Sequence, residues 1–336
     1  MKTRLDQFDV LRGGAILLVI LAHWINFYQL YNIRITNELA FFLKPFLLIV
    51  SLLYPVRMAL LFFISGYFCK IKNNFFEKKI SRIVYPYVIW SIILFFLNAP
   101  NPFNHKIYWQ YTLPLFFGFS PLVWYLYFLF VFYLLTYFIK NKVFLVIFSF
   151  IFVLSAPFVD SIIPQKFRTS FISIVDVSYY LLYFLSGYLF KILWSNIINL
   201  TIINKTLLLI VSFSFLITGI VFISRPTSVR FESFFAIIIV ISSLILITTL
   251  WKNAKDNNKF LHCSYALLCY IGNNSMRFYI LHYFILNSIF ILGLNKLTIF
   301  NHFFCLCYIF IFIPLSIKYG SDILFNFKFQ VNNSSK

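Results

Sequence analysis

Long apolar runs separated by short polar segments dominate the chain. A helix needs about 20 mostly apolar residues to cross the hydrocarbon core of a bilayer, and ten of the runs approach that length. We therefore predict an all-α integral membrane protein with about ten transmembrane helices in a single bundle. The predicted spans are residues 12–30, 56–71, 83–98, 121–139, 143–159, 177–193, 206–223, 233–251, 275–293 and 299–317.

One further apolar stretch, residues 39–55, is interrupted by Lys44-Pro45 and Tyr54-Pro55. Proline lacks a backbone donor and pushes the residue before it out of the helical region. We interpret this stretch as interfacial or re-entrant. If it spanned the membrane, the orientation of every later segment would be reversed.

The distribution of positive charge favours a cytoplasmic amino terminus. In that orientation the inner segments hold nineteen of the 28 Lys and Arg residues and the outer segments hold nine. Lys and Arg concentrate in short cytoplasmic loops, so this asymmetry supports ten spans with both termini inside. We expect residues 1–317 to form the transmembrane domain and residues 318–336 to form a short cytoplasmic tail.

Composition strengthens the membrane prediction and argues against a soluble domain and against a nucleic-acid-binding protein. Hydrophobic residues make up 62% of the chain and charged residues 11%, whereas soluble domains carry about 25% charged residues. The net charge of +19 is spread over short loops beside anionic lipid, so it does not indicate a nucleic-acid surface. The five cysteines include no C-x-x-C pair, and no metal site is predicted.

Arg12 and His23 are the most informative residues, because both lie in the first apolar segment. Eleven helical steps return to within about 20° of the starting direction and rise about 16 Å. Arg12 near the aqueous end would therefore place His23 near the middle of the membrane. Ionisable groups at that depth usually face the protein interior or a water-filled cavity. The alternative is that Arg12 anchors the topology and His23 only packs.

Three small or acidic residues lie close to Arg12 in the sequence. Asp9 can pair with Arg12 or favour the positive end of the first helix. Gly13-Gly14 lets a ligand or another helix approach closely, with helix packing as the simpler interpretation.

Two further motifs are compatible with binding. Ser65-Gly66 closes the second span, where Ser65 is more simply a packing residue than a nucleophile. Lys79 and Arg82 are three residues apart at the mouth of the third span and would fall on one face. They would form a phosphate clamp, or they are ordinary positive charges of a cytoplasmic loop.

Aromatic and histidine residues provide the remaining candidates. Trp124 and Tyr125 open the fourth span and suit either an interfacial belt or a platform for a sugar ring. His282 lies two turns inside the helix that begins near Asn274 and is a second ionisable group at depth. We place His262 in a polar loop.

The order and spacing of these motifs resemble the membrane-bound acyltransferase-3 family over nearly the whole chain. The motifs that carry the resemblance are Phe8-Asp9-Val10-Leu11-Arg12-Gly13-Gly14-Ala15-Ile16 followed by His23, Phe63-Ile64-Ser65-Gly66-Tyr67, the basic loop to Arg82 with Pro86-Tyr87, Trp124-Tyr125-Leu126, Leu185-Ser186-Gly187-Tyr188, and Gly272-Asn273-Asn274-Ser275 through His282. The basic loop departs from the family's pattern, in which two arginines are common, because Lys79 stands at the first position and lacks the guanidinium fork.

The resemblance implies transfer of an acyl group, usually acetyl, from cytoplasmic acyl-CoA to a bacterial surface glycan or a polyprenyl-linked sugar. Arg12, Lys79 and Arg82 would bind the acetyl-CoA donor, and no cofactor would be permanently bound. His23, assisted by Arg12, would act as general base or carry the acyl group. The predicted acceptor contacts are Ser65, Gly66, Trp124, Tyr125 and His282. His282 would hydrogen-bond the acceptor or orient His23.

The resemblance also implies a multi-pass protein of the bacterial inner membrane that contacts membrane lipid and no nucleic acid. Buried charges in a ten-helix protein also suit a transporter, such as a flippase of an oligosaccharide-lipid. A channel or scaffold is a third interpretation, in which Arg12 and His23 would be replaceable by isosteres.

Overall fold

The computed structural model describes residues 6–30, 50, 53, 55–71, 74–98, 124–162, 174–198, 230–254, 256, 258–291, 299–319 and 325. Regular structure within these residues is helical, which confirms the all-α fold class. The predicted span 206–223 lies outside the described residues, as do most of the stretch 39–55 and most of the tail 318–336.

The predicted spans within the described residues each coincide with a helix, with ends displaced by a few residues. The helices are α1 (Asp6–Leu30), the segment Pro55–Tyr67, α3 (Phe75–Lys79), the π-helix η1 (Ile80–Val84), α4 (Tyr85–Asn98), α6 (Trp124–Phe138), α7 (Lys142–Ile162), α8 (Ile174–Ile198), α10 (Arg230–Ala254), α11 (Lys259–Asn273), α12 (Ser275–Ile291) and α13 (Ile299–Tyr319).

By length and composition, one described helical segment, Asp6–Trp24, is sufficient to cross a membrane. The other apolar helical segments among the described residues are shorter, at 10–17 residues. These are Pro55–Tyr67, Trp124–Phe138, Val143–Val159, Ala236–Lys252 and Cys307–Lys318.

The chain divides into two compact units. The first comprises Met1–Tyr67 and Ser186–Pro314, and the second comprises Phe68–Leu185 and Leu315–Lys336. The two units therefore alternate along the sequence, each made of two segments.

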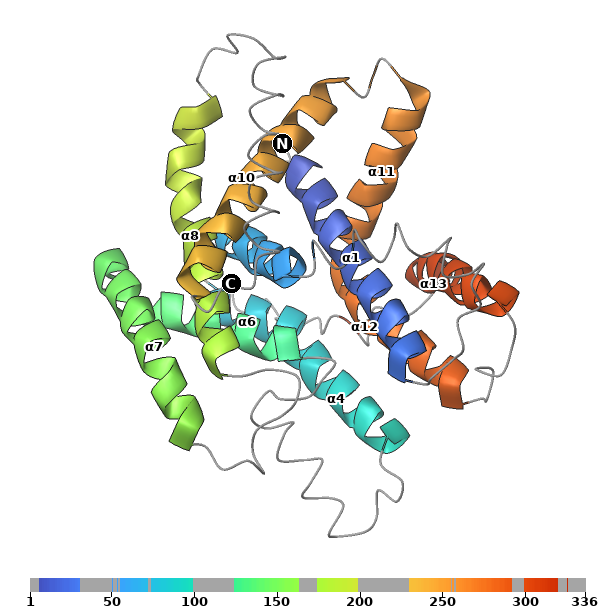
Figure 1. Cartoon of the computed structure of the whole chain (residues 1–336), viewed down its shortest axis with the longest axis horizontal. Helices are drawn as coiled ribbons and strands as arrows, with labels where there is room; N and C mark the ends of the chain where they lie inside the picture. Colours follow the sequence, from blue (N-terminus) through green and yellow to red (C-terminus); the bar gives the residue numbers. More distant parts are fainter. Residues whose placement is uncertain are drawn as a thin grey trace, which may run out of the picture. The chain divides into compact units, whose positions relative to one another are not determined.

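In the first unit, α1 packs against α10, α11 and α12, which come from the last third of the chain (Figure 1). The apolar side chains Phe8, Ile16 and Ile20 of α1 are almost completely buried, as is Phe278 of α12. This packing surrounds the helix that carries Arg12 and His23.

In the second unit, α3, η1 and α4 follow one another without a break, and α6 packs against η1. The sequence predicted a span beginning at residue 83, but the helix begins at Phe75. A π-helix adds a residue to a turn and often occurs at functional sites. Here it lies directly after Lys79 and contains Arg82.

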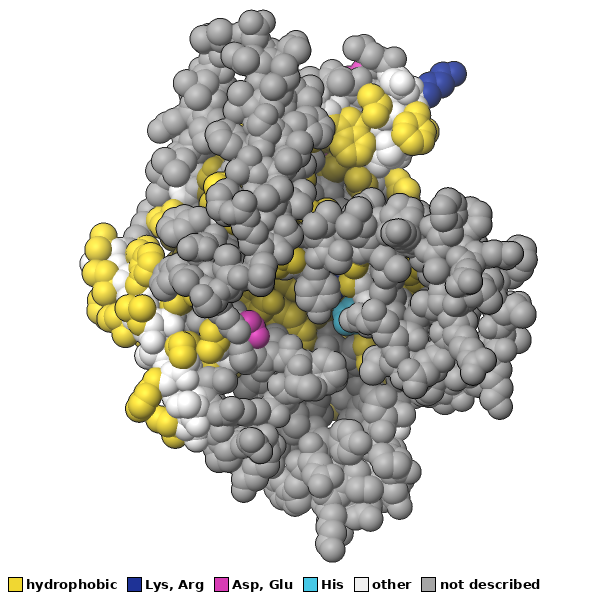
Figure 2. All heavy atoms as spheres, in the orientation of Figure 1, with side chains coloured by type: hydrophobic (Ala, Val, Ile, Leu, Met, Phe, Trp, Pro, Cys, Tyr) yellow, Lys and Arg dark blue, Asp and Glu magenta, His cyan; other side chains and the backbone are white. Residues whose placement is uncertain are grey.

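Helix α7 turns a broad apolar face outward, visible at the left of Figure 2. Leu154 and Phe158 are each 69% exposed, and Val143 is 67% exposed. An exposed apolar surface of this size marks a contact with another protein, a ligand or a membrane.

One prediction about secondary structure was wrong. His262, expected in a polar loop, lies on α11. Asn258 begins this helix because its side-chain oxygen accepts hydrogen bonds from the backbone N–H groups of Phe260 (2.8 Å) and Leu261 (3.4 Å). Such an N-cap satisfies donors at a helix start, and the polar residues of this stretch concealed the helix.

Candidate active site

Helix α1 carries Arg12 and His23 on one uninterrupted element, as the sequence predicted. The Arg12 guanidinium pairs with Asp9 one turn earlier, at 3.5 Å between Nη1 and Oδ1. The Asp9 side chain is buried, whereas that of Arg12 keeps 24% of its surface exposed. The pair holds Arg12 at the start of α1 while leaving part of it accessible.

The fold brings His282 of α12 beside His23 of α1. Their ring centroids are 5.4 Å apart, with 38° between the ring planes. Tyr283 also meets His23 edge-on, at 5.7 Å. His282 is 2% exposed and His23 is half-buried, so the second ring lies deeper than the first.

A backbone contact fixes the tautomer of His282. Its Nδ1 lies 2.8 Å from the carbonyl oxygen of Phe278, one turn earlier on α12. A carbonyl oxygen can only accept, so Nδ1 must carry the hydrogen and donate it. In the neutral ring Nε2 then carries the lone pair. This nitrogen is buried and has no hydrogen-bond partner among the described residues.

Arg57 is a site residue that the sequence interpretation missed, because it was counted only as a loop charge. It lies on the helix Pro55–Tyr67, is 8% exposed, and interacts electrostatically with both His23 and His282. An ionisable residue that is buried within an apolar helix is a candidate for a functional site. The first unit thus gathers one guanidinium and two imidazoles.

Glycines set the position of α1 against α11. A Cβ added to Gly13 would overlap the carbonyl of Leu268, and one added to Gly272 would overlap the carbonyl of Asp9. No atom lies within 4 Å of a Cβ added to Gly14. The predicted close approach is therefore confirmed at Gly13, where the neighbour is a helix backbone.

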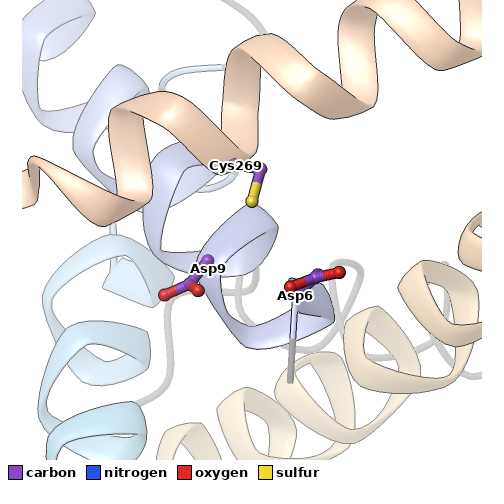
Figure 3. Close-up of side chains that lie close together, drawn as sticks. All are labelled: Asp6, Asp9 and Cys269. Atoms are coloured by element: carbon purple, nitrogen blue, oxygen red, sulfur yellow. The ribbon is translucent and has the colours of Figure 1, made fainter. Parts of the chain in front are cut away.

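Carboxylates gather at this crossing. Asp6 and Asp9 of α1 lie near Cys269 of α11, with their possible ligand atoms within 4.8 Å of one another (Figure 3). Asp9 is already paired with Arg12, so the arrangement has a structural explanation. The adjacent Tyr265 is buried, and burial together with the negative charge of Asp6 raises the pKa of its hydroxyl.

Ser65 and Gly66 lie near the end of the helix Pro55–Tyr67, and both are buried. The Ser65 hydroxyl donates to the carbonyl of Leu61 at 2.8 Å, a bond within its own helix. Gly187 of α8 lies so close to Phe63 that an added Cβ would overlap the Phe63 carbonyl. These contacts agree with packing as the simpler interpretation of Ser65.

The second unit holds Lys79 against aromatic rings. Its Nζ lies 3.2 Å from the centroid of Tyr133 and 5.6 Å from that of Phe75, which are cation–π contacts. Burial lowers the pKa of Lys79 from 10.5 to about 8, and the charge of Arg82 acts in the same direction. Arg82 is exposed. Lys79 is therefore held by the protein, whereas Arg82 is available to an anion.

Trp124 and Tyr125 begin α6 in the same unit. The Trp124 ring lies 5.5 Å from Tyr180 of α8 with 31° between their planes, and Tyr125 is buried. The Trp124 ring therefore packs against an aromatic residue of the same unit.

The comparison with known families agrees with this architecture. A family model described as an acyltransferase domain matches residues 5–319. The chain therefore belongs to the acyltransferase-3 family and is an acyltransferase, of a family whose members are typically membrane proteins. It matches no curated protein and no solved structure at a significant level.

Proposed function

We propose that this protein transfers an acyl group, most simply acetyl, from cytoplasmic acyl-CoA to a hydroxyl of a bacterial surface glycan or lipid-linked sugar. The observation that carries this proposal is the proximity of the His23 and His282 rings, 5.4 Å apart, which both interact electrostatically with Arg57. Acyl transfer to a hydroxyl needs a proton acceptor and a positive group for the developing oxyanion, and the three residues provide both.

The donor would be held by positive residues near the cytoplasmic surface. The resemblance to the family assigns Arg12 and Arg82 to the phosphates of acetyl-CoA; Arg12 is partly exposed in the first unit and Arg82 is exposed in the second. Lys79 would add charge from its aromatic surroundings. The pantetheine arm would then extend along α1 over a rise of about 16 Å to the thioester near His23.

The acceptor hydroxyl would meet the acyl group at His23. This residue would act as general base or carry the acyl group transiently, and both roles require a neutral imidazole. His282 would contact the hydroxyl, while Trp124, Tyr125, Ser65 and Gly66 are the proposed contacts for the rest of the acceptor. The protein would be a multi-pass protein of the inner membrane with both termini in the cytoplasm, and so would have access to both reactants.

Mass spectrometry of surface glycans from a deletion strain tests this proposal. We expect a loss of about one acetyl mass per repeating unit and its return when the gene is restored. Unchanged glycan masses in the deletion strain would refute glycan acylation. A transporter would instead remove the whole glycan from the surface, and its membranes would not release CoA from acetyl-CoA in the presence of acceptor.

A further inference from the structure

His282 presents one ring nitrogen in a defined chemical state. Because Nδ1 donates to the Phe278 carbonyl at 2.8 Å, Nε2 is the hydrogen-bond acceptor of the neutral ring. The atom is buried without a partner among the described residues. Buried polar atoms are nearly always hydrogen-bonded, so such an acceptor suggests a missing donor.

We propose that Nε2 of His282 takes the proton from the acceptor hydroxyl during acyl transfer. This inference rests on the proposed function and moves the role of general base from His23 to His282, so that His23 meets the acyl carbon or carries the acyl group. A hydroxyl is a donor that satisfies Nε2 in the ground state and gives up its proton in the reaction. His282 is thus a catalytic residue, whereas the sequence predicted only a contact to the acceptor or a role in orienting His23.

The neighbouring residues fit this role. The ring of His23 lies 5.4 Å from that of His282, so a hydroxyl bound at Nε2 is close to the group proposed to meet the acyl carbon. The guanidinium of Arg57 interacts electrostatically with both rings and would stabilise negative charge on the acyl oxygen.

The Phe278 carbonyl supports the same role in a second way. When Nε2 takes a proton the ring becomes positive, and the bond from Nδ1–H to the carbonyl becomes charge-assisted and stronger. The carbonyl therefore orients the ring before the reaction and stabilises the imidazolium formed in it. A carboxylate performs this task in hydrolase triads.

The chemical step balances with these residues. The hydroxyl oxygen forms a bond to the acyl carbon while its proton moves to Nε2 of His282. The bond from the acyl carbon to its leaving group then breaks, and His282 returns the proton to that group. The leaving group is the sulfur of CoA in direct transfer, or a nitrogen of His23 if the acyl group has first moved there.

Two variants separate a base from a structural hydrogen bond. His282→Asn keeps a side-chain donor toward the Phe278 carbonyl but removes Nε2, whereas His282→Ala removes both. A purely structural role predicts an active Asn variant and an inactive Ala variant. The proposed role predicts that both lose transfer by at least about a hundredfold. His262→Ala is the matched control, because His262 is an exposed histidine on α11.

The assay uses inverted membrane vesicles from the deletion strain, which contain the natural acceptor, and radiolabelled acetyl-CoA. Label in the glycan fraction measures transfer, and acetyl-CoA binding by detergent-purified protein verifies folding. We expect added imidazoles to restore transfer to the Asn variant, with rates that rise with the basicity of the imidazole. No label with the wild-type protein would refute the proposed function itself.

Two results with an active wild type would overturn the assignment of His282. One is a His282→Asn variant that keeps more than about a tenth of the transfer rate. The other is an inactive variant that binds acetyl-CoA and does not respond to any imidazole.

If the variant fails to bind acetyl-CoA, wild-type protein is treated with diethyl pyrocarbonate, which modifies unprotonated imidazole nitrogens. Mass mapping should then show that transfer falls in step with adducts on His282. Loss of transfer that follows adducts on His23 while His282 adducts leave it unchanged would overturn the assignment.

Discussion

Gly13 and Gly14 are neighbours on α1 with opposite surroundings, and alanine at each position gives a sharp test of the helix crossing. At Gly13 the added methyl group would meet the backbone of Leu268, and at Gly14 it would meet no atom within 4 Å. The two substitutions are chemically identical and lie in the same helix. Any difference in their effect therefore reports the contact with α11.

The magnitude follows from two terms. Replacing a helical glycine by alanine stabilises the folded state by about 0.5–1 kcal/mol, because glycine loses more conformational freedom on folding. Overpacking a tight contact costs about 1–3 kcal/mol, and the upper end applies where backbone must move. The helix term cancels in the comparison, so Gly13→Ala should be about 1–3 kcal/mol less stable than Gly14→Ala.

Thermal unfolding of the two purified variants in the same detergent measures this difference. We expect Gly14→Ala to unfold at or above the wild-type temperature and Gly13→Ala to unfold several degrees below it. Gly272→Ala should behave like Gly13→Ala, because it fills the other side of the same crossing. Equal unfolding temperatures for Gly13→Ala and Gly14→Ala would show that α1 and α11 do not meet as described.

Three other predictions concern the site and the topology. Glutamine in His23→Gln cannot accept a proton or an acyl group, so transfer should fall at least about a hundredfold while acetyl-CoA binding survives. Near-normal glycan acetylation by this variant would show that His23 has no catalytic role. Burial lowers the pKa of Lys79 to about 8, so its reaction with an amine reagent should be half-maximal near that pH. Mass spectrometry measures the reaction, with the exposed Lys78 as the reference for reagent access. A half-maximal reaction at a pH of about 10 or above would contradict the aromatic packing. Cysteines introduced in the segment 72–80 should be shielded from an impermeant thiol reagent in intact cells, whereas one at His105 should react. Labelling of both positions, or the reverse pattern, would mean that residues 39–55 span the membrane.

The helices were predictable because apolar runs of this length carry a strong signal. The ends of the helices were less predictable, because they depend on local groups such as the Asn258 side chain, which caps the start of α11. The π-helix after Lys79 has no marker in the composition of residues 80–84. Helix α11 was missed because polar residues interrupt its apolar positions, although Tyr265 and Ile271 are buried in the structure.

The candidate site was predicted in part. The spacing of Arg12 and His23 depends on a single helix and could be read directly. The proximity of His23 to His282 depends on packing between α1 and α12, which no local pattern encodes. Arg57 was missed for the same reason, since a charge count cannot distinguish a buried guanidinium from one in a loop.

The packing of α1 has a consequence for how the protein is made. Helix α1 packs against α10, α11 and α12, which are synthesised after residue 229. Chains fold as they emerge, and contacts between distant segments must wait for the later segment. Arg12 and His23 therefore spend most of the synthesis time without their final neighbours, while residues Phe68–Leu185 of the second unit are made. Transfer activity should begin only when the last third of the chain has been inserted, so a protein shortened before α12 would hold the first histidine of the site without the second.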